Sequence, residues 1–305
     1  MISNPPNAYT GHPSLGIQLN EGVFDITVND QLTFHATHEP GGYRNVSKAP
    51  RTAQADVWML GCSYTYGYGV NDEENFTSLL QNRYPRVHFR NAGVIGHGTV
   101  QALMRLKKMM IQGHPKMVLL NFSSYHFMRN TLSQQYRSHL KIGYSRASKS
   151  AQQQMAVARF PFMRSCENSL QLVAWDDIYD HWPGRESLAT VHSMQKTYDR
   201  LLEDVDQQIE VAACLIQEMA QICKDNGVIF HVVCLDRSPA TQQLKMKTGN
   251  IPWLDVGYSF SDTTMTNHPY DDHPNPKGHR FIADQIDQHL APAFQKLSQT
   301  TLSEL

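Results

Sequence analysis

The sequence predicts an α/β fold in which a mostly parallel sheet is covered by helices on both faces. Four short apolar runs that end in small or polar residues are typical of buried parallel strands: residues 55–62, 87–94, 116–123 and 228–235. A weaker fifth run covers residues 251–256. Helical patterns fall between these runs, and such alternation is typical of a three-layer arrangement of helix, sheet and helix.

Helix signals mark the segments between the strands. Asp72 is expected to cap a helix that ends before Pro85, and Thr99 one that ends at Gly113. Apolar residues recurring every three or four positions predict one long helix over residues 191–225.

The last helix is predicted to begin at Asn275 and Pro276, an N-cap residue followed by proline at the first helical position. It is expected to fray into a polar tail after Pro292.

Two regions fall outside this alternation. In residues 1–50, Phe24, Ile26 and Val28 alternate with polar residues, which predicts a half-buried strand in a small β-rich accessory element packed on the main domain. Residues 127–190 are polar and poorly periodic, and a stretch of this length between a strand and a helix is more often a functional cover than disorder. We therefore expect an accessory element over 1–50 and a main domain over 51–305 that carries an inserted cover.

Composition argues against several classes of partner. The formal net charge of the 305 residues is -1, so no broad basic face is expected to bind nucleic acid. The N-terminus lacks the layout of a signal peptide, and no run approaches the roughly 20 apolar residues that cross a membrane. The cysteines are odd in number and scattered, mostly within apolar stretches, which predicts reduced core residues in a cytoplasmic protein. They are Cys62, Cys166, Cys214, Cys223 and Cys234.

Two distant segments carry the residues of a nucleophilic hydroxyl group. Ser63 lies where the first predicted strand gives way to glycines, and Asp271, Asp272 and His273 lie just before the last predicted helix. A histidine can take the proton of a serine hydroxyl while a carboxylate orients the imidazole ring. In parallel sheets such chemistry gathers at the carboxyl ends of the strands, where residues 93–98 and 123–126 are also expected.

These residues resemble the motifs of the SGNH hydrolases, also called the GDSL esterase/lipase superfamily. The first motif is similar to Gly61-Cys62-Ser63, with cysteine where aspartate is usual, and the second to Asn91-Ala92-Gly93-Val94-Ile95-Gly96. The motif with an acid shortly before His-Pro resembles Asp271-Asp272-His273-Pro274. The resemblance implies a flavodoxin-like fold for residues 51–305, Ser63 as nucleophile, His273 as base, and the backbone N–H groups of Ser63 and Gly96 as an oxyanion hole.

The third motif departs from the family pattern. Its Gly-x-Asn-Asp aligns with Ser123-Ser124-Tyr125-His126, so the asparagine that donates to the oxyanion is missing. Tyr125, His126 or Ser124 could donate in its place. The family's acid most often lies three residues before the histidine, where this chain has Tyr270, so we expect Asp271 to orient His273 and keep Asp272 as the alternative.

Four further residues are candidates for substrate binding. Arg129 and Asn130 could bind an anionic substrate group, although a solvated loop arginine is the alternative. Trp182 and Arg185 could line a cleft or pack the inserted region. The fifteen histidines show no repeated metal-ligand spacing, so neither a metal nor another cofactor is expected.

The sequence therefore predicts a serine hydrolase that cleaves an acyl or acetyl ester of a small molecule or carbohydrate. An acyltransferase that uses the same Ser63 is the first alternative, and a non-catalytic binding protein with this fold is the second. The expected partner is a small-molecule ester, without nucleic acid or membrane, and no feature of the sequence predicts an oligomeric state.

Overall fold

The computed structural model describes residues 2–50, 55–145 and 147–299. Its strands are β1 (Ile2–Asn4), β2 (Tyr9–His12), β3 (Gly16–Leu19), β4 (Gly22–Val28), β5 (Leu32–Glu39), β6 (Tyr43–Arg44), β7 (Ala55–Gly61), β8 (Val87–Gly93), β9 (Met117–Phe122), β10 (Arg159–Phe162), β11 (Gln171–Ala174), β12 (Ile229–Cys234) and β13 (Trp253–Asp255). Its helices are α1 (Ser63–Tyr66), α2 (Phe76–Arg83), α3 (Thr99–Gln112), α4 (Tyr125–Asn130), α5 (Gln134–Ser145), α6 (Lys149–Met155), α7 (Ala189–Leu201), α8 (Val205–Asp225), α9 (Pro239–Lys247) and α10 (Pro276–Gln299). The five runs predicted as buried strands are confirmed as β7, β8, β9, β12 and β13.

A nine-stranded sheet organises the chain, in the order β1-β4-β5-β6-β8-β7-β9-β12-β13. The strands from β8 to β13 pair in parallel, in the 2-1-3-4-5 order of flavodoxin-like sheets. The strands from β1 to β8 pair antiparallel. The sheet is therefore mixed, and the expectation of a mostly parallel sheet holds only for its β8–β13 half.

The N-terminal strands continue the main sheet. Arg44 in β6 pairs with Asn91 in β8, and this pair joins the β4–β5 hairpin to the edge of the parallel strands. Phe24, Ile26 and Val28 in β4 are buried, as their alternation predicts. Residues 1–50 are thus rich in strands, as predicted. They extend the main sheet, whereas we expected a separate element packed on the main domain. The predicted boundary at residue 51 falls on residues 51–54, which lie outside the described part of the chain.

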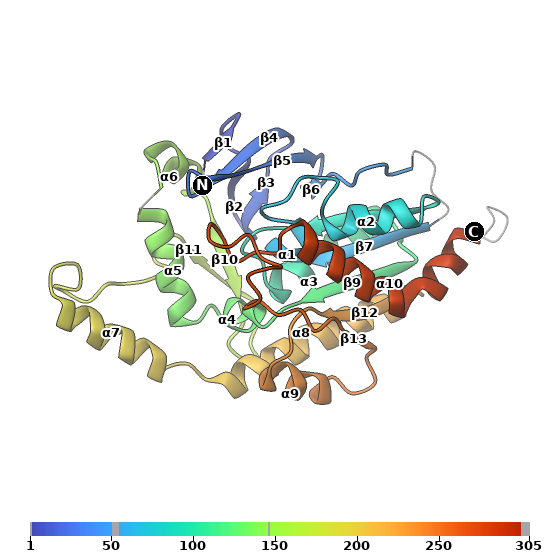
Figure 1. Ribbon diagram of the computed structural model, residues 1–305. Helices are drawn as coiled ribbons and strands as arrows, with labels where there is room; N and C mark the ends of the chain where they lie inside the picture. Colours follow the sequence, from blue (N-terminus) through green and yellow to red (C-terminus); the bar gives the residue numbers. More distant parts are fainter. Residues whose placement is uncertain (1, 51–54, 146, 300–305) are drawn as a thin grey trace.

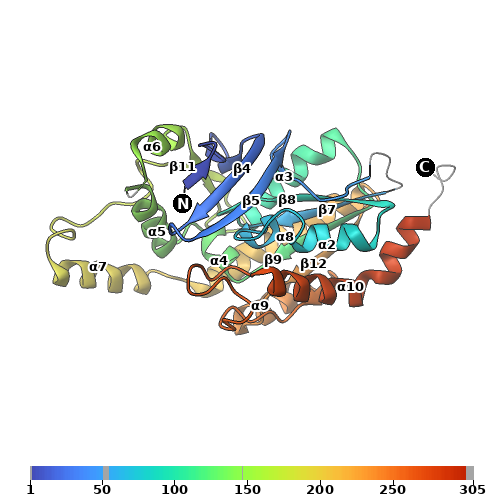
Figure 2. The ribbon, with the colours of Figure 1, turned by 45° about the horizontal axis from the view of Figure 1, so that its top comes forward.

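Helices cover both faces of the sheet (Figures 1 and 2). Successive residues of β7 show why: Val57 and Met59 are buried against α2 and α10, while Trp58 and Leu60 are buried against α3 and α8. The two apolar clusters lie on opposite sides of the same strand, which makes the three-layer arrangement predicted from the alternation of strands and helices.

Three predicted helix boundaries are wrong. Asp72 does not cap α2, because Asn75 does: its Oδ1 accepts from the Ser78 N–H at 3.0 Å. The long helix predicted over 191–225 is two helices, since Asp204 caps α8 by accepting from the Gln207 N–H at 2.9 Å. The last helix continues through Pro292 to Gln299, because Phe294 beyond the proline is fully buried in the core.

Two other predicted helix starts are one residue off or correct. Gly98, one residue before the predicted Thr99, is the N-cap of α3. Asn275 caps α10 as expected, with its Oδ1 accepting from the Gly278 N–H at 3.0 Å.

The region predicted as a cover has a core of its own. Its buried cluster includes Tyr136, Phe160, Trp175 and Tyr179. In both ribbon views α7, which follows this region, lies at the end of an arm that extends away from the sheet (Figures 1 and 2). None of the helices in the described residues is long and apolar enough to cross a membrane.

A disulfide corrects the cysteine prediction. Cys166 in the cover is bonded to Cys214 in α8, at a sequence separation of 48. Cys62, Cys223 and Cys234 are free and buried, as predicted. Spacing alone did not reveal the pair because tertiary packing brings α8 beneath the cover.

Candidate active site

Ser63 is positioned by a tight turn at the carboxyl end of β7. It is the first residue of the short helix α1 and only 4% exposed. The turn packs closely on β8: a Cβ atom added to Gly93 would lie 2.3 Å from the Tyr66 backbone nitrogen. Glycine is therefore required at position 93 for the Ser63 turn to approach its neighbouring strand.

Ser63, His273 and Asp271 form a continuous chain of hydrogen bonds. The Ser63 Oγ atom lies 2.8 Å from His273 Nε2, and His273 Nδ1 lies 2.6 Å from Asp271 Oδ1. Asp271 Oδ1 also accepts from the His273 backbone N–H at 2.7 Å. Asp272 is exposed, so the structure brings Asp271, and not its neighbour, to the imidazole ring.

The electrostatics of Asp271 suit a carboxylate that stays ionised. Burial opposes its charge, yet the hydrogen bonds and the nearby charge of His273 hold the pKa of Asp271 below its ordinary value. With the proton of neutral His273 on Nδ1, that nitrogen donates to Asp271. The Nε2 atom is then free to accept from the Ser63 hydroxyl group.

Aromatic rings enclose the His273 imidazole. The Tyr64 ring lies 5.0 Å from it and the Tyr68 ring 4.8 Å, centroid to centroid. Tyr64 also stacks on Phe260 at 4.8 Å. These rings pack against His273, whose side chain keeps an exposed fraction of 24%.

The loop after β8 lies beside the Ser63 turn. The Val94 N–H donates to the Gly61 carbonyl group at 3.3 Å, which ties the start of this loop to the end of β7. Gly96 has φ +72°, a conformation that favours glycine, and its carbonyl group accepts from the Tyr136 hydroxyl group at 2.9 Å. No residue in the described ranges accepts from the Gly96 N–H. The position fits the predicted oxyanion donor.

The loop after β9 replaces the third motif. The Ser124 N–H donates to Asp236 Oδ1 at 2.8 Å, so Asp236 already uses it. Tyr125 is 39% exposed, and its ring lies 6.1 Å from the Tyr64 ring at the rim of the site. Of the predicted replacements for the missing asparagine, only the Tyr125 side chain faces outward here.

His126 is not available as the predicted donor. Its side chain is fully buried, its Nδ1 lies 3.2 Å from Thr99 Oγ1, and its ring contacts Phe122. Burial, with Arg129 and His97 nearby, lowers the pKa of His126 well below its ordinary value. It is a neutral core residue beneath the α3–α4 contact, and we withdraw it from the oxyanion prediction.

Several solved structures resemble this chain. The psychrotrophic esterase EstA from Pseudoalteromonas sp. matches 79% of this chain and 99% of its own, with 14% sequence identity and a TM-score of 0.44. TesA matches 78% and 98%, with 12% identity and a TM-score of 0.44. A member of the lipolytic protein G-D-S-L family from Veillonella parvula matches 77% and 98%, with 10% identity and a TM-score of 0.41. At these identities the likeness concerns the fold alone.

No family model matches the sequence, and no curated protein matches it. Of these three structures, the one from Veillonella parvula is described as a member of the G-D-S-L family.

The four candidate substrate-binding residues divide into two groups. The Arg129 Nη1 atom donates to the carbonyl group of His97 at 2.9 Å, beside Gly96, so Arg129 lies at the site. Asn130 is buried, and its Oδ1 accepts from the Val100 N–H at 3.2 Å, which gives it a structural role.

Trp182 and Arg185 pack the inserted region. The Trp182 ring contacts Tyr198 of α7, and Arg185 donates to the Tyr179 and Ser138 hydroxyl groups. Arg185 is only 7% exposed. Their positions favour the packing alternative over a cleft.

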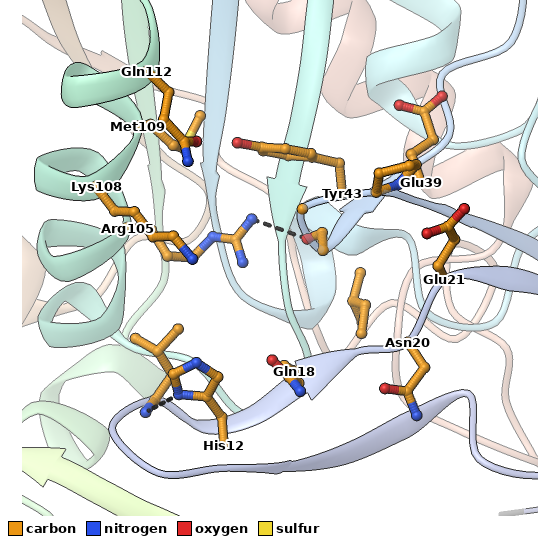
Figure 3. A pocket seen from close by; sticks show the side chains of 15 residues that line it. His12, Gln18, Asn20, Glu21, Glu39, Tyr43, Arg105, Lys108, Met109 and Gln112 are labelled. Atoms are coloured by element: carbon orange, nitrogen blue, oxygen red, sulfur yellow. Dashed lines mark hydrogen bonds between the residues drawn. The ribbon is translucent and has the colours of Figure 1, made fainter.

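A separate cavity of about 250 Å³ lies between the N-terminal strands and α3 (Figure 3). Arg105 and Lys108 of α3 lie on one side of it, and Glu21 and Glu39 on the other (Figure 3). Its lining includes neither Ser63 nor His273, so this cavity is distinct from the candidate active site.

The structure adds positioning residues that the sequence prediction missed. Tyr64 and Tyr68 follow Ser63 closely in the sequence, and this closeness was a usable signal. Phe260 and Arg44 are distant from Ser63 in the sequence, and no sequence signal pointed to them. Arg44 donates to the carbonyl groups of Tyr66, Gly67 and Val70, and so fixes the segment that follows α1.

Proposed function

We propose that this chain is a serine hydrolase of SGNH type that cleaves an acyl or acetyl ester of a small molecule or carbohydrate. The observation that carries the proposal is the hydrogen-bond chain from Ser63 through His273 to Asp271.

In the proposed reaction His273 Nε2 takes the hydroxyl proton as Ser63 Oγ bonds to the ester carbonyl carbon. The carbonyl oxygen becomes an oxyanion, and Asp271 stabilises the imidazolium ion. Collapse of this intermediate breaks the ester bond, and His273 returns the proton to the departing alcohol. Water then attacks the acyl-enzyme with His273 again as base, which releases the acid and restores Ser63.

The backbone N–H groups of Ser63 and Gly96 are the proposed oxyanion donors. Tyr136 supports this assignment because its bond to the Gly96 carbonyl group holds the loop in place. The proposed mechanism uses no cofactor.

Acyl transfer to an acceptor other than water is a second candidate function. It is favoured by the low exposure of Ser63, at 4%, and by the rings of Tyr64 and Tyr68 around His273. An acyl-enzyme shielded from water survives long enough to meet another alcohol or amine.

The Cys166–Cys214 disulfide bears on the compartment of the protein. The sequence prediction of a cytoplasmic protein assumed reduced cysteines, and disulfides are typical of oxidising compartments, so this bond removes that argument.

Turnover of p-nitrophenyl esters from acetyl to octanoyl tests the proposal. We expect Ser63→Ala to lower kcat by at least about 10⁴-fold. Ser187→Ala, which changes an exposed serine of the inserted region, is the matched control and should retain activity. Equal turnover in wild type and Ser63→Ala would refute the assignment.

Covalent labelling separates the alternatives. A fluorophosphonate should attach to Ser63 if the hydroxyl group is activated, and digestion with mass spectrometry locates the adduct. Labelling without ester turnover would favour the acyltransferase. No labelling of folded protein would favour a non-catalytic binding protein.

A further inference from the structure

We propose that the guanidinium group of Arg129 is the third oxyanion donor of this site, replacing the asparagine that the third motif lacks. The inference rests on the proposed function and assigns to a cationic side chain a role usually filled by a neutral amide.

The first observation is the position of Arg129 against the Gly96 loop. Its Nη1 donates to the carbonyl group of His97, the residue after Gly96, at 2.9 Å. Its Cζ atom also lies 5.8 Å from the centroid of the Tyr136 ring, and the Tyr136 hydroxyl group donates to the Gly96 carbonyl group. The guanidinium group is thus fixed to this loop directly and through Tyr136.

The second observation connects the same group to the Ser63 turn. The Arg129 Cζ atom lies 5.7 Å from the Tyr125 ring, which in turn contacts Tyr64. Tyr64 is the residue that follows Ser63. The same cation is therefore linked, through Tyr125 and Tyr64 on one side and His97 on the other, to both loops whose N–H groups are the proposed oxyanion donors.

The third observation is that this charge has no counter-ion. Arg129 is in none of the ion pairs found among the described residues, and its Nε atom is buried without a hydrogen-bond partner. Burial opposes the charge, but Tyr136, Cys62 and Tyr64 hold the pKa of Arg129 above its ordinary value. The guanidinium group therefore stays charged without a carboxylate partner, and a negative charge formed beside it during the reaction would be stabilised.

The chemistry of the side chain suits this role. A guanidinium group has five N–H donors in a fixed plane, and the bond to His97 uses one of its nitrogens. The replacements predicted from the sequence fit less well, since His126 is buried against Thr99 and the Ser124 N–H is bound to Asp236.

Kinetics of Arg129→Met and Arg129→Lys test the inference with two p-nitrophenyl esters, the neutral acetate and the carboxylate-bearing hemisuccinate. We expect Arg129→Met to lower kcat by about 10²–10³-fold for both esters, with little change in KM. Arg129→Lys keeps the charge but not the planar guanidinium group, so its kcat should lie between the values of wild type and Arg129→Met. Arg137→Met is the matched control, because Arg137 is a partly buried arginine of the neighbouring helix α5 that packs on Phe162.

The rate of fluorophosphonate labelling at Ser63 is measured alongside, with thermal unfolding to verify that each variant is folded. Slower labelling of both Arg129 variants than of Arg137→Met would support the role. An unchanged kcat for acetate, with KM raised only for hemisuccinate, would overturn it and make Arg129 a substrate-carboxylate site. Unfolding of Arg129→Met with wild-type kinetics in Arg129→Lys would also overturn it. Absence of labelling in the wild type would instead overturn the proposed function, and the role of Arg129 with it.

Discussion

Arg44 and Asp72 form a buried ion pair next to the segment that leaves the Ser63 turn. The Arg44 Nε atom donates to Asp72 Oδ1 at 2.9 Å, and the two side chains are 0% and 7% exposed. The other nitrogens of Arg44 donate to the carbonyl groups of Tyr66, Gly67 and Val70. A single guanidinium group therefore connects β6 of the N-terminal strands to the backbone that follows Ser63.

Removing the charge of Asp72 should destabilise the protein strongly. Asp72→Asn leaves Arg44 buried without its counter-ion, and we expect the free energy of unfolding to fall by about 3–5 kcal/mol. Urea unfolding followed by circular dichroism measures the change. Asp284→Asn is the matched control: Asp284 pairs with Arg83 at the surface, with side chains 53% and 31% exposed, and should cost under about 1 kcal/mol. Equal shifts in the two variants would contradict the buried-pair argument.

The choice between Asp271 and Asp272 can be tested by two isosteric substitutions. We expect Asp271→Asn to lower kcat by about 10²–10⁴-fold, because the amide no longer fixes the tautomer or stabilises the imidazolium ion of His273. Asp272→Asn should retain wild-type kcat, since Asp272 is exposed. Steady-state kinetics with p-nitrophenyl acetate distinguishes them, and a loss confined to Asp272→Asn would reverse the assignment.

The features of the fold and site that the sequence predicted correctly are those set by residues close together in the chain. The five parallel strands were predictable because buried strands read as short apolar runs, and the helix start at Asn275 because capping is set by adjacent residues. Ser63, Asp271 and His273 were found because each lies within a short motif. The order of strands then brings the ends of β8, β7 and β9 side by side, as the topology argument anticipated.

The wrong predictions concern features that are set by contacts between residues distant in the sequence. Asp72 was predicted to cap a helix, but its carboxylate pairs with Arg44. Cys166 was predicted to be a reduced core residue, but tertiary packing brings it to Cys214, with which it forms a disulfide. His126 followed the right strand, yet its side chain turned into the core because the α3–α4 contact buries it. Arg129 was singled out for an anionic group, but its position beside Gly96 required the structure.

Buried histidines should make stability fall in mild acid. Burial lowers the pKa of His279 and of His97 to about 3, and that of His38 to about 4. The unfolded chain binds protons at these side chains below about pH 6.5, whereas the folded chain does not, so stability is complete above that pH and decreases below it. Between the pKa of the folded chain and that of the unfolded chain, each of these histidines should change the free energy of unfolding by about 1.4 kcal/mol per pH unit.

The matched pair for this prediction is His279→Gln and His289→Gln. His279 is buried near Arg44 and His273, and its Nδ1 accepts from the Phe76 N–H, a bond that glutamine can replace. His289 is exposed. Unfolding free energies measured from pH 7 to pH 5 should depend less steeply on pH in His279→Gln alone, and an unaltered slope would count against the argument.

The Cys166–Cys214 bond should be detectable by thiol counting and by its effect on stability. Of the five cysteines, three are free, so an unreduced denatured sample should react at three thiols with a thiol reagent. Because the bond closes a loop of 48 residues, reduction should cost about 2–4 kcal/mol, measured by urea unfolding with and without dithiothreitol. The Cys166→Ser/Cys214→Ser variant is the control, since it should start at the reduced stability and no longer respond to dithiothreitol. Five reactive thiols in the unreduced wild type would rule out the bond and restore the argument for a reducing compartment.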